Sequence, residues 1–230
     1  MVHVVADAYS QSFVLVGLLL GIPVVGSFHT DIIDLLRTHH AFFFQEWFVL
    51  AKEMTDSFVL DAAATTSQSF QHKLRTHQVH CDHVLITAVD SGVFAPSRCS
   101  AQVRSELTFN DADNAFLCVY VGRISEEKRI DVLIEALRLL RSGGTRAYLA
   151  IIGDGPQAAK YAALHSKESR IYCRPRFLSH DELAGLYASS DVHVTASEFE
   201  TLGNTVLEAN ACALPVVTPR TQGFVNTVQH

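Results

Sequence analysis

Two glutamates eight residues apart, Glu200 and Glu208, flank a turn that could open a helix. The turn is Gly203-Asn204-Thr205, and the residues after it have the pattern of a short helix between two apolar, buried strands. A helix start leaves backbone N–H groups without partners at the positive end of its dipole, which suits a phosphate. The glutamates are too far apart in sequence to form an adjacent acid pair, so the spacing favours separate hydroxyl-binding roles.

Two cations follow an earlier apolar run in the same half of the chain. Arg123 and Lys128 lie on the loop after the predicted strand Phe116–Val121. A diphosphate leaving group gains charge as its bond breaks, and a guanidinium with an ammonium can offset that charge. Alone, such a pair is typical of a solvated loop. Together with the Gly203 turn at the same sheet edge, it predicts a diphosphate site.

His29 is the strongest candidate in the first half of the chain. It follows the predicted strand Pro23–Phe28, and ligands of open α/β sheets gather at the carboxyl ends of strands. An imidazole there could hydrogen-bond a sugar or steady charge during a transfer. The chain has 12 histidines, so a structural role is the competing interpretation.

Strands and helices alternate along the whole chain, which predicts parallel sheets and an α/β fold. The first half is predicted to contain strands Val2–Ala6, Pro23–Phe28, Ser57–Leu60 and Val84–Ala88, with helices Ser10–Leu20, Ala41–Thr55 and one opened by Thr66-Ser67. The second half is predicted to contain strands Phe116–Val121, Ala147–Ile152, Arg170–Cys173, Asp191–Thr195 and Leu214–Thr218, with helices Ile130–Leu140, one ending near His165, His180–Ala188 and Thr205–Cys212. We expect residues 1–96 to belong to one Rossmann-like domain, 97–114 to a linker and 115–230 to a nucleotide-binding Rossmann-like domain.

Composition limits the classes of protein and partner. A hydrophobic content of 48% over 230 residues supports a packed core, in one large or two small domains. The formal net charge of −6 argues against nucleic acid as the main partner. The five cysteines are scattered, without a Cys-x-x-Cys pair, which favours a reducing compartment and no structural zinc.

The uncharged run from Ala8 to Phe28 has nearly the length of a membrane span. Gly21-Ile22-Pro23 interrupts it, and its first residues are polar, so the run favours a buried helix that turns into a core strand. No signal peptide is expected before it. The absence of Gly-x-Gly-x-x-Gly, of Gly-x4-Gly-Lys-Ser/Thr and of Gly-x-Ser-x-Gly argues against NAD enzymes, P-loop NTPases and serine hydrolases.

Several of these motifs carry a resemblance to a known family. Glu200-Thr-Leu-Gly-Asn-Thr-Val-Leu-Glu208 resembles the Glu-x7-Glu signature of the retaining family 4 (group 1) glycosyltransferases. The loop from Gly122 to Lys128 is similar to the family's diphosphate loop, and Phe28-His29-Thr30 to its aromatic-His-Thr element. Further similar pieces are Ala88-Val-Asp-Ser-Gly-Val-Phe94-Ala-Pro96 and Gly153-Asp154-Gly155-Pro156.

The resemblance implies two Rossmann-like domains facing a cleft, the GT-B type, with the amino-terminal domain incomplete. It implies retaining transfer of a sugar from a UDP-sugar donor without a bound metal or other cofactor. Its residue roles would be Glu200 and His29 toward the donor sugar, Glu208 toward the ribose, Arg123, Lys128 and the Gly203-Asn204-Thr205 helix start toward the diphosphate, and Asp154 beside the nucleotide.

Within the family the motifs look closest to the sulfolipid synthases, which move sulfoquinovose from UDP onto diacylglycerol. This implies a lipid acceptor and peripheral membrane contact. The sequence does not identify the compartment, and a reducing one would be the cytoplasm or the plastid stroma. Arg37, His39 and His40 follow His29 closely enough to be cations for a sulfonate, or a solvated helix end.

The chain also departs from the family's pattern. Other residues stand where the family commonly has glycine, at Ala88, Arg176 and Ala213, and Asn210 replaces a common methionine. The first strand and last helices of the family are expected to be missing, so the chain would be partial. A non-catalytic nucleotide-sugar-binding module or inactive fragment therefore stays as the alternative, and an epimerase on the same plan as a third possibility.

Overall fold

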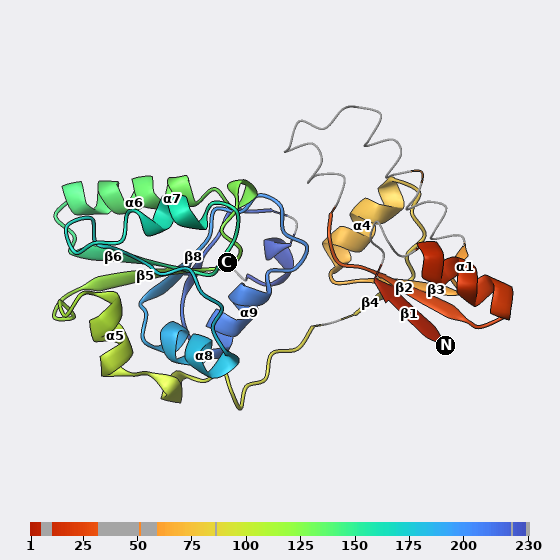
Figure 1. Cartoon of the computed structure of the whole chain (residues 1–230), viewed down its shortest axis with the longest axis horizontal. Coiled ribbons are helices and arrows are strands. Elements are labelled where there is room, and N and C mark those ends of the chain that lie inside the picture. Colours follow the sequence, from red (N-terminus) through yellow and green to blue (C-terminus); the bar gives the residue numbers. More distant parts are fainter. Residues whose placement is uncertain (6–10, 32–50, 52–58, 86, 222, 229–230) are drawn as a thin grey trace. The chain divides into compact units, whose positions relative to one another are not determined.

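The chain forms two compact units, each a parallel α/β sheet with helices packed on it (Figure 1). The computed structural model describes residues 1–5, 11–31, 51, 59–85, 87–221 and 223–228. Unit 1 comprises Met1–Thr87, Phe199–Gly203 and Arg220–His230, and unit 2 comprises Ala88–Glu198 and Asn204–Pro219. The parallel strands confirm the predicted α/β class.

Unit 1 has four parallel strands in sequence order. These are β1 (Val2–Val5), β2 (Val24–Phe28), β3 (Ala62–Thr65) and β4 (His83–Val84). Helices α1 (Gln11–Leu20) and α4 (Gln68–Thr76) pack on the sheet. Buried Phe28, Phe70 and Leu74 fill the core between α4 and the strands. Ser67 caps α4, as predicted, because its Oγ accepts a hydrogen bond from the Phe70 N–H at 3.2 Å.

Helix α1 and strand β2 confirm the predicted turn from a helix into a core strand, but the helix is not buried. Only Val14 and Gly17 are buried among its described residues, and Leu19 is 76% exposed. The helix is apolar on all sides, so its pattern could not indicate which face meets the sheet. No helix in the described part of the chain is long and apolar enough to span a bilayer.

The third strand lies further along the chain than predicted. Val59 is helical and Leu60 lies in a bend, whereas Ala62–Thr65 pairs with β2 in the register Val25 to Ala62. The prediction of a strand at Ser57–Leu60 is therefore wrong at its end, and residues 57 and 58 lie outside the described residues. Alanine is depleted in strands, so the sequence of Ala62–Thr65 does not mark it as one, although most of it is buried.

Other predictions for unit 1 fall on residues that the structure does not describe. They concern the predicted helix Ala41–Thr55, apart from Ala51, and the possible sulfonate cations Arg37, His39 and His40. The predicted strand Val84–Ala88 is shorter, as β4 ends at Val84.

Unit 2 has five parallel strands in the order β7-β6-β5-β8-β9. They are β5 (Phe116–Val121), β6 (Ala147–Ile152), β7 (Ile171–Cys173), β8 (Val192–Val194) and β9 (Val216–Val217). The chain starts at the central β5, proceeds outward to β7, and then returns to place β8 on the other side of β5. This reversal between β5 and β8 is the topological switch point, where open α/β sheets form ligand crevices.

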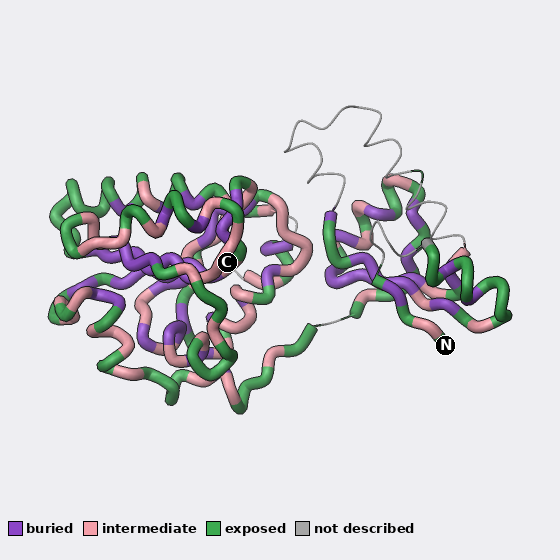
Figure 2. The backbone as a smooth tube through the Cα atoms, in the orientation of Figure 1, coloured by how far each residue is buried: buried purple, intermediate pink, exposed green. Residues whose placement is uncertain are grey.

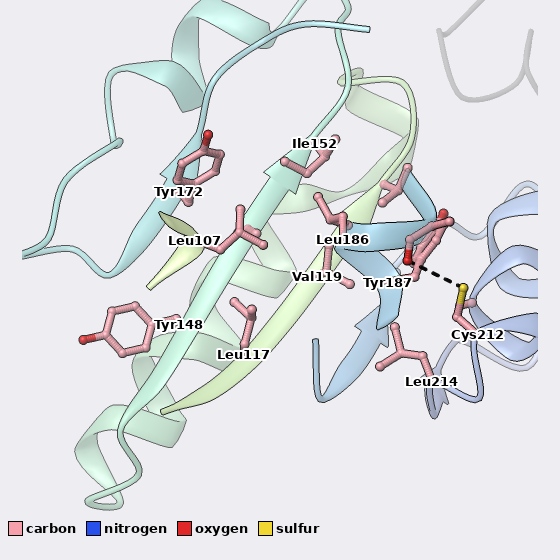
Figure 3. Close-up of a cluster of buried hydrophobic side chains, with 14 of the residues drawn as sticks. Leu107, Leu117, Val119, Tyr148, Ile152, Tyr172, Leu186, Tyr187, Cys212 and Leu214 are labelled. Carbon is pink, nitrogen blue, oxygen red and sulfur yellow. Dashed lines mark hydrogen bonds between the residues drawn. The ribbon is translucent and has the colours of Figure 1, made fainter. Parts of the chain in front are cut away.

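Helices cover both faces of this sheet. Helices α6 (Ile130–Ser142) and α7 (Ala158–Ala162) lie on one face, and α5 (Ala101–Leu107), α8 (His180–Ala188) and α9 (Asn204–Ala211) on the other (Figure 1). The alternation along β5 is visible in its neighbours, since Leu117 and Val119 join the α8–α9 core while Cys118 and Tyr120 join the α6–α7 core. Figure 2 shows the resulting buried strands, and Figure 3 shows the α8–α9 core.

Residues 97–114, predicted as a linker, are a folded part of unit 2. They include the end of a 3₁₀ turn (Pro96–Arg98) and α5, and Leu107 is buried in the α8–α9 core. Both guanidinium nitrogens of Arg104 donate to the Asp191 carboxylate, at 3.2 and 2.8 Å. The first boundary between the two units thus lies between Thr87 and Ala88. Helix α5 is mostly polar and only its Leu107 is buried, which is why its sequence has the pattern of a linker.

Candidate functional site

Three loops leave the unit 2 sheet at the carboxyl ends of β5, β6 and β8, which are adjacent parallel strands. The predicted residues Arg123 and Lys128 lie on the β5 loop and Asp154 on the β6 loop. Helix α9 connects β8 to the parallel strand β9, so its first residue, Asn204, lies at the same edge. The structure therefore gathers these candidates at one edge of the sheet, beside the switch point.

The β5 and β6 loops are fastened to each other by their backbones. The Ile124 N–H donates to the Asp154 carbonyl at 2.8 Å, and the Gly122 N–H donates to the Ile152 carbonyl at 3.0 Å. Gly153 has φ +138°, and a Cβ on it would lie 1.9 Å from the Gly122 carbonyl oxygen. A side chain there is thus excluded by conformation and by contact. The glycine allows the two loops to approach closely enough to form one rigid rim.

A cavity of about 680 Å³ opens against this rim. Arg123, Asp154 and Arg176 are its charged lining residues, and Leu178 and Leu183 form part of an apolar wall. The side chain of Arg123 is exposed, but its backbone is fixed, because its carbonyl accepts a hydrogen bond from the Tyr120 hydroxyl at 2.8 Å. Guanidinium groups suit phosphate oxygens, and an apolar wall suits a flat ring. Arg176, the departure from the family's glycine, adds a second guanidinium and pairs with Glu182 at 3.6 Å.

Lys128 connects the β5 loop to the segment after β8. Its Nζ lies 3.4 Å from the hydroxyl of the fully buried Ser197, and the next residues, Arg129 and Glu198, form an ion pair. Arg129 takes a left-handed conformation with φ +51° between a 3₁₀ turn and α6, which turns the loop toward β8. The ammonium is therefore positioned at the switch point between β5 and β8.

Glu208 is half-buried on α9 and faces α8. Its Oε2 accepts a hydrogen bond from the buried Tyr187 hydroxyl at 3.0 Å. Burial raises the pKa of Glu208 above its ordinary value, against the opposing effects of the Tyr187 hydroxyl and of His180. Near the start of the same helix, Thr205 is half-exposed and Asn204 exposed. Gly203, with φ +84°, precedes the helix and is assigned by its contacts to unit 1.

The structure brings the other two candidates, His29 and Glu200, into unit 1. Thr201, the residue after Glu200, donates its hydroxyl hydrogen to the His29 carbonyl at 2.8 Å, although the two are 172 residues apart. The Ser67 hydroxyl donates to the Thr201 carbonyl at 2.7 Å. The loop that carries Glu200 is thus fixed to the loops after β2 and β3. Glu200 itself is half-buried.

Sequence reasoning missed the side chains that hold these candidates. Ser27, Tyr187 and Ser197 contact His29, Glu208 and Lys128 respectively. Ser27 alone had a sequence signal, since it lies two residues before His29 and hence on the same face of an extended chain. Within the described residues, no three His, Cys, Asp or Glu side chains form a group that could hold a metal ion.

A parallel α/β unit with cations and a helix start at its switch point has the layout of a nucleotide-binding domain. Residues 115–230 match the family described as glycosyl transferases group 1, and the chain belongs to this family. The predicted family resemblance is thereby confirmed.

The relatives of this chain are named for different substrates. The sulfoquinovosyl transferase SQD2 of Arabidopsis thaliana is 36% identical over 140 residues, which are 61% of this chain and 26% of the relative. A GDP-mannose-dependent alpha-mannosyltransferase of Corynebacterium glutamicum is 29% identical over 213 residues, 91% of this chain and 48% of the relative. The chain therefore spans from about a quarter to about a half of these curated relatives.

Among solved structures, Anabaena Alr3699/HepE in complex with UDP and glucose superposes with a TM-score of 0.75 at 20% identity. The match covers 99% of this chain and 61% of that chain. WaaG, described as a glycosyltransferase involved in lipopolysaccharide biosynthesis, superposes with a TM-score of 0.68 at 17% identity, over 94% of this chain and 65% of that chain. The likeness shows a fold shared with glycosyltransferase structures and agrees with the predicted GT-B class.

Proposed function

We propose that the protein belongs to a retaining glycosyltransferase whose unit 2 binds the diphosphate of a nucleotide-sugar donor. The observation that carries this proposal is the meeting of three loops at the switch point. The β5 loop supplies the Arg123 guanidinium and the Lys128 ammonium, the β6 loop is bonded to it as a rim, and the segment after β8 leads to the first residues of α9. A departing nucleoside diphosphate gains negative charge, and cations and helix-start amides held in place stabilise that charge at little reorganisation cost.

The remaining candidates have roles that follow from their chemistry. Glu208 would accept hydrogen bonds from the ribose hydroxyls, and Asp154, on the rim beside the cavity, would lie next to the nucleotide. Glu200 and His29 would handle the hydroxyls of the transferred sugar. Both carboxylate and imidazole accept hydrogen bonds from hydroxyl groups, which supports these assignments. The family resemblance implies that transfer proceeds without a bound metal.

For the nucleotide we propose uridine diphosphate. The motif resemblance to sulfolipid synthases and the UDP named in the HepE structure support uridine, whereas the mannosyltransferase relative is named for GDP-mannose. Calorimetric titration of this chain with UDP and, separately, with GDP tests the base. Tighter binding of GDP would contradict the assignment of uridine but not that of a diphosphate site.

The diphosphate site is tested by the Arg123→Ala and Lys128→Ala variants in the same titration. Each should weaken UDP binding by about tenfold or more, because a charge-assisted bond to phosphate is lost. Arg138→Ala is the matched control, since Arg138 is an exposed arginine on α6 paired with Glu135. Equal affinity in all three variants would overturn the site. UDP binding without sugar transfer would favour a non-catalytic binding module.

For the acceptor we propose a lipid, with peripheral contact between the protein and its membrane. Relatives are named for lipid products, among them the alpha-monoglucosyldiacylglycerol synthase of Acholeplasma laidlawii, 34% identical over 107 residues, which are 46% of this chain and 27% of the relative. The exposed apolar residues of α1 support a lipid surface as partner. They are Phe13, Leu15, Val16, Leu18, Leu19 and Leu20.

Sedimentation with phosphatidylcholine vesicles that contain diacylglycerol tests the membrane contact. We expect the chain to sediment with vesicles and Leu19→Asn to reduce the bound fraction. Leu139→Asn, at a similarly exposed leucine on α6 of unit 2, should not reduce it. No sedimentation of the unmodified chain, or equal loss in both variants, would overturn the contact.

A further inference from the structure

A fully buried serine hydroxyl in unit 1 lies between two histidine rings. The Oγ of Ser27, on β2, is 2.9 Å from the Nε2 of His3 and 2.9 Å from the Nε2 of His29. Ser27 has no exposed surface, whereas both imidazoles are exposed at the sheet's border. The three side chains thus form a continuous hydrogen-bonded row from β1 to the loop after β2.

The sheet itself holds this row in place. Strands β1 and β2 are parallel, with His3 opposite Val25 and Val5 opposite Ser27. Side chains alternate along strands, so His3, Val25 and Ser27 share one face, and His29 continues it two residues later. The His29 backbone is fixed in turn, because its carbonyl accepts the Thr201 hydroxyl at 2.8 Å. Neither ring can leave the row without losing a bond to Ser27.

A serine hydroxyl has one proton to donate and lone pairs to accept. When both imidazoles are neutral, Ser27 donates to one Nε2 and accepts from the other Nε2–H. One ring therefore carries its proton on Nε2 and the other on Nδ1. The proton position on one histidine determines that on its partner, and the two Nδ1 atoms differ as well, one being a donor and one an acceptor.

We propose that His3 is a positioning residue that acts through Ser27 to set which nitrogen of His29 carries the proton, and that the row can pass a proton from His29 to His3. The transfer starts from the arrangement in which His29 carries its proton on Nε2 and Ser27 donates to His3. When a second proton joins the Nδ1 of His29, the Nε2 proton of His29 moves to the Ser27 oxygen as the Ser27 proton moves to the Nε2 of His3. His29 is then neutral with Nδ1–H, His3 is the imidazolium, and Ser27 is again a hydroxyl.

The consequence for a ligand concerns the Nδ1 of His29. His3 would decide whether that atom donates a hydrogen bond to a hydroxyl or accepts one, and it would remove positive charge from His29 after a proton arrives. This use in sugar handling rests on the proposed role of His29. The coupling of the two rings does not, since it follows from the row alone.

The coupling is tested on this 230-residue chain by nitrogen-15 NMR of the histidine rings, recorded well above the ordinary histidine pKa range. We expect opposite tautomers for His3 and His29. In Ser27→Ala and His3→Phe the ring signals of His29 should move toward those of an exposed imidazole. His83→Phe is the matched control, because β4 is the opposite edge strand of the same sheet. Backbone spectra confirm that each variant is folded.

Two results would overturn the proposal. One is the same tautomer on His3 and His29 in the unmodified chain, and the other is a His29 signal that His3→Phe leaves in place. Addition of UDP-glucose separates this inference from the proposed function. If the rings are coupled but no ring signal responds to UDP-glucose, the positioning inference stands and the sugar role of His29 fails. If UDP-glucose binds while the rings behave independently, only the coupling fails.

Discussion

His193 should make unit 2 less stable in acid, because its ring is fully buried and cannot take up a proton cheaply. Its Nδ1 is 3.1 Å from the Val119 carbonyl, and its Nε2 has no hydrogen-bond partner in the described part of the chain. The Tyr187 ring packs against it edge-on at 5.7 Å. Burial lowers the pKa of His193 from 6.5 to about 4, against the opposing effect of the Val119 carbonyl.

The sign and size follow from proton linkage. The unfolded chain binds a proton at this histidine below about pH 6.5, whereas the folded chain does so only near pH 4. Stability is therefore present above pH 6.5 and is lost as the pH falls toward 4. With these two pKa values, His193 costs about 2 kcal/mol at pH 5 relative to pH 8.

The perturbation is His193→Phe, which keeps an aromatic ring and removes the titrating group. We expect its free energy of unfolding to fall by about 2 kcal/mol less than that of the unmodified chain between pH 8 and pH 5. Urea unfolding followed by the near-ultraviolet signal of tyrosine reports on unit 2, since five of the six tyrosines lie there. His193→Leu serves as a second variant if phenylalanine overfills the core.

His72→Phe is the control, because His72 is exposed on α4 of unit 1. It should leave the pH dependence of unit 2 unchanged. The reasoning is refuted if His193→Phe and the unmodified chain lose stability in parallel between pH 8 and pH 5. It is refuted equally if NMR shows the His193 ring taking up a proton near pH 6.5.

Three further predictions concern the residues that hold the site. Gly153→Ala should lower the free energy of unfolding of unit 2 in urea by about 2 kcal/mol or more, because a Cβ there meets the Gly122 carbonyl at a positive φ. Gly143→Ala, at φ −77° with ordinary contacts, should cost nothing, and equal effects of the two substitutions would contradict the close approach of the β5 and β6 loops. Tyr187→Phe should raise the pKa of Glu208 further, because burial remains and the hydroxyl that lowers the pKa is gone; a carboxyl carbon-13 titration that shows a fall would contradict this. Arg104→Ala should lower the free energy of unfolding by about 2 kcal/mol, since it leaves the Asp191 carboxylate without its guanidinium partner. Arg138→Ala, at an exposed arginine, should lower it by under about 0.5 kcal/mol, and similar unfolding midpoints for the two variants would contradict this prediction.

Some parts of the fold follow directly from the sequence. Strands Phe116–Val121 and Ala147–Ile152 and helix His180–Ala188 have the predicted bounds, because long apolar runs and a capped start leave few alternatives. Strand β3 does not follow, since Ala62–Thr65 lacks the bulky residues that distinguish strands. Helix α5 does not follow from the sequence either. Only Leu107 of its residues is buried, so the segment lacks the repeated apolar positions that predict a helix.

Part of the candidate site can likewise be predicted from the sequence, and part of it cannot. That Arg123, Lys128 and Asp154 share an edge follows from one rule of parallel sheets, so the sequence suffices. The contacts from Tyr187 to Glu208 and from Ser67 to Thr201 depend on how helices and loops pack. No local pattern encodes such pairs, because each partner is an ordinary residue for its own element.

The segment Phe199–Gly203 explains why Glu200, proposed for the sugar, belongs to unit 1, whereas Arg123 and Lys128, proposed for the diphosphate, belong to unit 2. Its contacts are with unit 1, where Thr201 is held by His29 and Ser67, whereas Asn204 already begins a helix of unit 2. The position of Glu200 is therefore set by the same loops as that of His29. Arg123 and Lys128 lie instead on the β5 loop of unit 2, which is bonded to the β6 loop, and Lys128 also contacts Ser197 after β8.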